Sequence, residues 1–156
     1  MNGLLLEYAR IVINVVFFAL DVMGIKIAVS SYVRSCLLET VHDSLGVNPE
    51  ARMAIETFIS HFKAAWEKND PWEMAKAIVQ LIMDLQAFGL LWMIIESVVF
   101  KMSEWDRLMT GLGVSLTVTA ALATGGLALV AQIACGILAA KSLIGLIMDV
   151  SKFPKG

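Results

Sequence analysis

The run from Leu108 to Ala140 contains no charged residue. An apolar run of about 18 or more residues without charge is typical of a helix that crosses a lipid bilayer. As one straight helix this run would measure ~50 Å, which exceeds the ~30 Å hydrocarbon core of a membrane. Gly125 and Gly126 stand near its middle and permit a turn. The run therefore predicts a hydrophobic helical hairpin over residues 103–151.

The composition agrees with a membrane environment. Hydrophobic residues make up 58% of the 156 residues, against about 45–50% in an average soluble domain. Charged residues make up 17%, against about 25%, and the mean hydropathy is +0.77. The net charge of -2 argues against a nucleic-acid partner, which requires a basic face. It also leaves no polybasic patch for anionic lipid.

The N-terminal segment, residues 4–29, is expected to be an apolar helix with one polar stripe. At about 100° per residue, four side chains fall within about 60° of one another. They are Glu7, Arg10, Asn14 and Asp21. Two interpretations stay open. The stripe turns to water or to partner helices, or it lines a pore in an oligomer, since charges inside a membrane face a bundle interior or an aqueous cavity.

The middle of the chain predicts two amphipathic helices over residues 30–69 and one long helix over 70–101. Asn48-Pro49 and Asp70-Pro71 each combine a capping side chain with a proline at the first helical position, which marks a helix start. Glu96 is isolated in the nearly apolar second half of the long helix. It is a candidate polar site inside a membrane, for a proton or cation, or the partner of a nearby cation.

Small residues recur at helical spacing along both expected arms of the hairpin. Such spacing allows helices to approach closely inside a membrane, and it equally suits a tightly packed soluble core. The candidate packing residues are Gly111, Ser115, Ala128, Gly136 and Ala140. Gln132 lies among them as a second candidate polar group inside the membrane. These residues predict helix–helix contact, within the hairpin or between copies of the chain.

Signatures of catalysis, metal binding or cofactor binding are missing from the sequence. The two histidines are His42 and His61. Glu39 and His42 form one Glu-x-x-His pair, but the second pair of a di-iron site is missing. The two cysteines have no metal-ligand spacing. No nucleophile elbow, phosphate-binding loop or dinucleotide fingerprint occurs. We therefore expect a protein that is not an enzyme, with no cofactor and no metal.

Together these features predict one all-α domain over residues 1–156. We expect a helical bundle with a central hydrophobic hairpin, embedded in a membrane, with about four apolar and two amphipathic helices. The apolar spans are expected near residues 8–29, 78–100, 108–124 and 127–148. The expected partners are a lipid bilayer and further copies of the same chain.

Three functions are compatible with this architecture. The first is an integral membrane protein that self-associates and forms a pore or channel. The second is a bundle whose amphipathic helices cover a hydrophobic hairpin until the hairpin enters a bilayer. That design is similar, in architecture only, to colicin pore domains and Bcl-2 proteins, and no sequence motif of either family occurs. The third is a structural subunit of a larger membrane complex.

Overall fold

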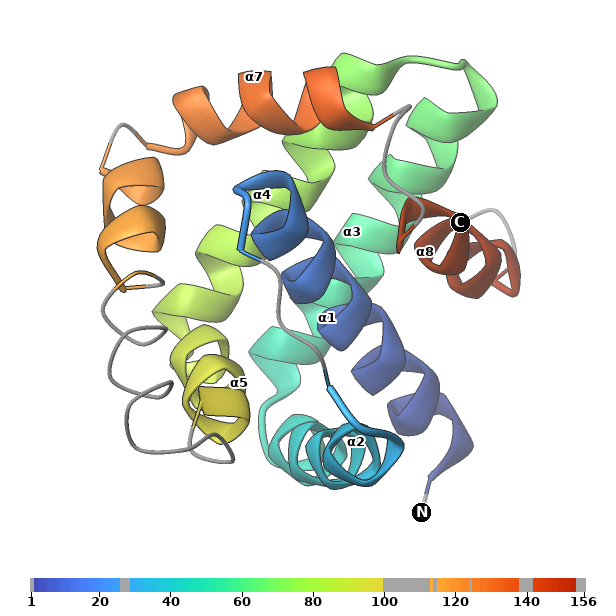
Figure 1. The fold of residues 1–156 in the computed structure, drawn as a ribbon. Coiled ribbons are helices and arrows are strands. Elements are labelled where there is room, and N and C mark those ends of the chain that lie inside the picture. Colours follow the sequence, from blue (N-terminus) through green and yellow to red (C-terminus); the bar gives the residue numbers. More distant parts are fainter. Residues whose placement is uncertain are drawn as a thin grey trace.

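The computed structural model describes residues 2–25, 29–99, 113, 115–123, 125–137 and 142–153. Within these residues the chain forms helices and no strand, which confirms the all-α class (Figure 1). The helices are α1 (Gly3–Val22), α2 (Ser31–Gly46), α3 (Pro49–Glu67), α4 (Pro71–Ala87), α5 (Leu90–Val99), α7 (Leu127–Gly136) and α8 (Ser142–Ser151). A further helical segment spans Ser115–Leu122.

Local capping sets the beginnings of α3 and α4. The Asn48 side chain accepts a hydrogen bond from the amide of Ala51 at 3.0 Å, and Pro49 occupies the first turn of α3. Asp70 caps α4 in the same way, and Pro71 begins that helix. Both helix starts predicted from the sequence are confirmed. The connection between the end of α3 and the start of α4 is short, and these two helices pack against each other.

α1 occupies the centre of the bundle (Figure 1). It packs against α2, α3, α4, α7 and α8. Its most deeply buried large side chains are Ile11, Val12, Ile13, Val15, Val16, Phe18 and Leu20. The expectation of a central hairpin is corrected by this arrangement. The described part of the charge-free run lies at the periphery, where Leu116 is 72% exposed and Leu127 is 70% exposed.

The described parts of the expected hairpin are helical at Ser115–Leu122, α7 and α8, while residues 103–112 of the expected first arm lie outside the described residues. Ser115–Leu122 and α7 lie at 109° to each other. The turn between them uses the predicted glycines, with φ of 67° at Gly125 and 83° at Gly126. α7 packs mainly on α4, whereas α8 packs on α1. The second arm expected from the sequence is therefore divided between two neighbours in the bundle.

The single long helix expected over residues 70–101 is also corrected. α4 ends at Ala87, α5 begins at Leu90, and their axes differ by 85°. Gly89 between them has φ of 79°, and its amide donates to the carbonyl of Gln86 at 3.0 Å. A glycine in the left-handed region after the last helical turn is a common helix stop. The break lets α5 pack on α2.

Among the described helices, α1 is the one that is long and apolar enough to cross a membrane by itself. Two further spans arise only if the bent pairs are each counted as one, namely α4 with α5 and Ser115–Leu122 with α7. The sequence predicted about four apolar spanning helices. The described part of the chain has fewer, and residues 108–112, 114, 124 and 138–141 of the expected spans lie outside it.

Candidate functional site

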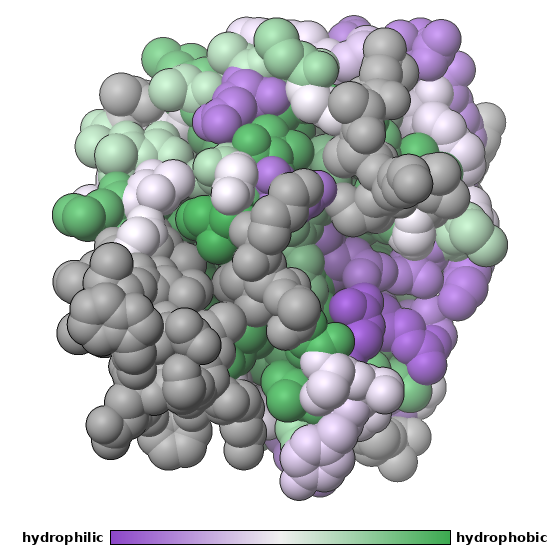
Figure 2. All heavy atoms as spheres, in the orientation of Figure 1, coloured by the Kyte–Doolittle hydropathy of each residue, from purple (hydrophilic) through white to green (hydrophobic). Residues whose placement is uncertain are grey.

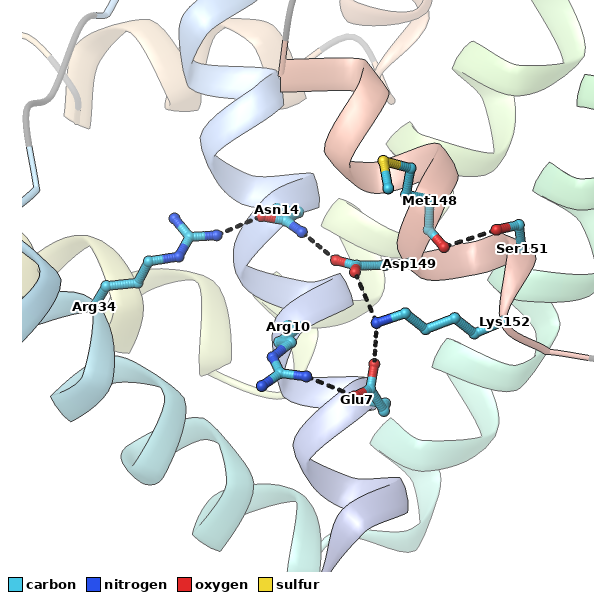
Figure 3. Close-up of polar contacts among 8 residues, drawn as sticks. All are labelled: Glu7, Arg10, Asn14, Arg34, Met148, Asp149, Ser151 and Lys152. Carbon is cyan, nitrogen blue, oxygen red and sulfur yellow. Dashed lines mark hydrogen bonds and ion pairs between the residues drawn. The ribbon is translucent and has the colours of Figure 1, made fainter.

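The predicted polar stripe of α1 lies on the side of that helix that faces α2 and α8. Figure 3 shows Glu7, Arg10 and Asn14 among side chains that reach toward them from these two helices. Glu7 and Arg10 form an ion pair of 2.6 Å along α1. This follows from the helix repeat, which places residues three apart on one side. Within the bundle the stripe is therefore covered by neighbouring helices.

Asp149 of α8 and Lys152, which directly follows α8, supply two charged groups that complete the stripe. The Asn14 amide nitrogen donates to a carboxylate oxygen of Asp149 at 2.5 Å. The Lys152 ammonium lies 3.4 Å from a carboxylate oxygen of Glu7 and 3.7 Å from one of Asp149. Lys152 thus bridges two acidic side chains from two helices. These contacts hold α8 against α1.

α2 supplies the remaining contact through Arg34. Its guanidinium donates to the side-chain oxygen of Asn14 at 2.6 Å. Asn14 therefore uses its amide nitrogen toward α8 and its oxygen toward α2. We call Glu7, Arg10, Asn14, Arg34, Asp149 and Lys152 the polar network.

The polar network is partly exposed to water. The side chain of Asp149 is 15% exposed and that of Glu7 is 27% exposed, whereas that of Lys152 is 53% exposed. Exposed ion pairs contribute only about 0–1 kcal/mol each. The network therefore specifies how α1, α2 and α8 pack more than it stabilises the fold. Asp21, the fourth residue of the predicted stripe, lies about two turns beyond Asn14, is partly buried and has an interaction of its own.

The C-terminal end of α1 is held by α7. The side-chain nitrogen of Gln132 donates to the backbone carbonyl of Val22 at 3.2 Å. A Cβ atom placed on Gly136 would lie 3.3 Å from a methyl carbon of Val22. Two of the residues predicted for helix contact inside a membrane, Gln132 and Gly136, thus make their contact inside the same chain.

The other predicted packing and polar residues lie elsewhere. Ser115 and Ala128 are exposed, and Gly111 and Ala140 fall outside the described residues. Glu96 is exposed on α5 and makes no hydrogen bond or ion pair with any described residue. The structure therefore brings together the first three residues of the stripe, and separately Gln132 with Gly136, but not the whole predicted set.

Sequence reasoning did not predict that Arg34, Asp149 and Lys152 would join the stripe. In the sequence Arg34 is a cation on the apolar side of an amphipathic helix, and Asp149 is an acid in an otherwise apolar segment. A charge among apolar positions indicates a partner on a facing helix, because burying an unpaired charge is costly. That signal does not identify the partner.

A second polar feature is an open groove of about 420 Å³ between α3 and α4. Ala64, Ala65 and Ala77 form its apolar part, and His61, Lys68, Glu73, Lys76 and Gln80 form its polar part. Lys76 is paired with Glu73 at 3.4 Å. In the described part of the chain, no group of three or more His, Cys, Asp or Glu residues is arranged to hold a metal ion.

Comparisons of the chain with protein-family models, with curated proteins and with solved structures find no match.

Proposed function

We propose that this protein is a membrane-inserting helical bundle that stores α1 in its core and releases α1 into a lipid bilayer. One observation carries the proposal. The helix at the centre of the bundle is also the described helix that can cross a membrane by itself. Its 20 residues correspond to ~30 Å of helix, which matches the ~30 Å hydrocarbon core of a bilayer.

If α1 leaves the bundle, moving it into lipid costs much less free energy than exposing it to water. Each fully buried Val, Leu, Ile or Phe side chain contributes about 1.5–3 kcal/mol. For the seven large side chains of α1 named above, exposure to water would cost about 10–20 kcal/mol. Transfer to hydrocarbon avoids this cost. The polar network opposes separation by less: about 0–1 kcal/mol for each ion pair and about 1.5–3 kcal/mol for the hydrogen bonds of Asn14.

The closed form has the surface of a compact monomer. Its accessible surface is 8170 Å², close to the ~7,700 Å² expected from its mass of 17.0 kDa. The outer helices α3 and α4 are amphipathic, with buried and exposed sides. Such helices keep α1 from water before a membrane is met. These features support storage of the spanning helix rather than permanent embedding of all helices.

Self-association and pore formation are further parts of the proposal. When α1 leaves the bundle, Asn14 and Glu7 lose their partners on α2 and α8. Polar groups inside a membrane face a helix bundle or an aqueous cavity. We therefore expect inserted copies to gather with the stripe turned inward, where it would line a water-filled path.

A disulfide across α1 and α7 tests the release of α1. A Cβ on Gly136 would lie 3.9 Å from the Cβ of Val22, and disulfides prefer about 3.5–4.5 Å. The variant Val22→Cys/Gly136→Cys is made in a chain with Cys36→Ser and Cys135→Ser. Insertion into vesicles is measured by resistance to alkaline carbonate extraction, and permeabilisation by release of an enclosed dye.

We expect the oxidised variant neither to insert into vesicles nor to release dye. The reduced variant should insert and release dye. The chain with only Cys36→Ser and Cys135→Ser is the control. Its insertion and dye release should be the same with and without the oxidant. Equal insertion of the oxidised and reduced forms would contradict the release of α1. Insertion of the reduced variant without dye release would agree with the departure of α1 from the bundle but contradict pore formation.

A further inference from the structure

The exposed surface of the charge-free run is unlike the rest of the molecule. Leu116 and Leu127 are 72% and 70% exposed. The exposed residues around them in the sequence are small and mostly apolar, among them Ala120, Ala123, Ala128 and Ala131. Figure 2 shows mostly weakly polar to hydrophobic surface at the upper left, interrupted by one hydrophilic patch, whereas hydrophilic surface gathers on the side of α8. We call the exposed residues of 115–123 and 127–131 the charge-free surface.

We propose that the charge-free surface is the face with which the closed bundle first docks on an electrically neutral lipid bilayer. This inference rests on the proposed function, because the bilayer is the same partner, but it concerns a different step. Docking on this surface comes before α1 is released. It requires only that Leu116, Leu127 and their neighbours leave water, with the bundle still closed.

The chemistry of the surface favours lipid over a protein partner. Protein interfaces are enriched in Trp, Tyr, Phe and Arg, which carry most of their binding energy. Residues 113–137 contain none of these four residue types. The charge-free surface therefore lacks the side chains that hold most protein interfaces together.

The absence of charge further selects the kind of membrane. Anionic lipid attracts Lys and Arg, at about 1 kcal/mol for each basic residue near the surface. The charge-free surface offers none, and the whole chain has a net charge of -2. Its attraction therefore comes from apolar area alone. A neutral phosphatidylcholine bilayer satisfies this chemistry, and added anionic lipid should not strengthen binding.

The exposed hydrophobic side chains of Val47 and Met53 do not form a comparable surface. Val47 is 84% exposed and Met53 is 64% exposed. Glu50 and Arg52 lie close to them in the sequence, so this region carries charges of both signs. Single exposed hydrophobic residues are normal on a protein surface. Val47 and Met53 therefore provide a matched control with similar exposure and similar chemistry.

The experiment compares two double variants by flotation with phosphatidylcholine vesicles. The first is Leu116→Glu/Leu127→Glu and the second is Val47→Glu/Met53→Glu, so that both change the net charge equally. All four positions are exposed, so both variants should keep the unfolding midpoint of the parent chain. We expect the first variant to lose at least about tenfold in vesicle binding, and the second to bind like the parent.

The outcomes separate this inference from the proposed function. If both variants float like the parent, or if both lose binding equally, the charge-free surface is not the docking face, although release of α1 stands. A parent chain that sediments in buffer as a dimer, and becomes monomeric only with Leu116→Glu/Leu127→Glu, would assign this surface to a second copy instead. A parent chain that never binds vesicles overturns both proposals.

Discussion

Gly126 should be among the least replaceable residues of the fold, while its neighbour Gly125 should tolerate change much better. Both have positive φ, 83° and 67°. A Cβ added to Gly126 would lie 2.6 Å from a methyl carbon of Val79 and 3.2 Å from the sulfur of Met83. A Cβ added to Gly125 would meet no atom within 4 Å. The two positions therefore share backbone strain and differ in packing.

The expected magnitudes follow from these two terms. An alanine in the left-handed region costs about 1–2 kcal/mol, which applies to both Gly125→Ala and Gly126→Ala. Insertion of a methyl group into a well-packed contact costs about 1–3 kcal/mol more, which applies to Gly126→Ala alone. We expect losses in the free energy of unfolding of about 1–2 kcal/mol for Gly125→Ala and about 2–5 kcal/mol for Gly126→Ala.

The measurement is urea unfolding followed by far-ultraviolet circular dichroism. With a slope of about 2 kcal/mol per molar urea, the loss at Gly126 would lower the midpoint by about 1–2.5 M. The slope itself should not change, because the surface exposed on unfolding stays the same. Equal midpoints for the two variants would refute the contact between the start of α7 and α4.

The remaining stability predictions use the same measurement. Asn14→Ala removes hydrogen bonds to Arg34 and Asp149 and should lower the free energy of unfolding by about 1.5–3 kcal/mol. The control Gln80→Ala removes an exposed hydrogen bond on α4 and should cost under about 0.5 kcal/mol. Similar losses at both sites would argue against the polar network. Gly136→Leu should lose about 1–3 kcal/mol because it presses on Val22. Gly145→Ala, with no atom near the new methyl group, should gain about 0.5–1 kcal/mol, and a loss there would contradict the open side of α8.

The sequence by itself determined the elements that depend on neighbouring residues. Asn48-Pro49 and Asp70-Pro71 mark the starts of α3 and α4, because a cap and a proline act within a single turn of helix. The stripe on α1 follows from the helix repeat, and three of its members do lie together. The turn at Gly125 and Gly126 was equally local. None of these depends on what packs against the helix.

The break at Gly89 and the partners of the stripe were decided by tertiary structure. A glycine inside an apolar helix is tolerated in many sequences, so its presence does not require a stop. In the fold Gly89 takes a left-handed conformation, which turns α5 toward α2. Likewise, Arg34 and Asp149 lie far apart in the sequence and meet at Asn14 only because α2 and α8 both pack on α1.

The position of the most apolar helix was also a tertiary outcome. By absence of charge, the run from Leu108 to Ala140 was the stronger candidate for the centre of the bundle. α1 occupies that position, although it carries Glu7 and Arg10. Hydrophobic stabilisation scales with the apolar area removed from water. The Ile, Val and Phe side chains of α1 offer more area than the Ala- and Gly-rich run, and α2 and α8 supply partners for its few polar groups.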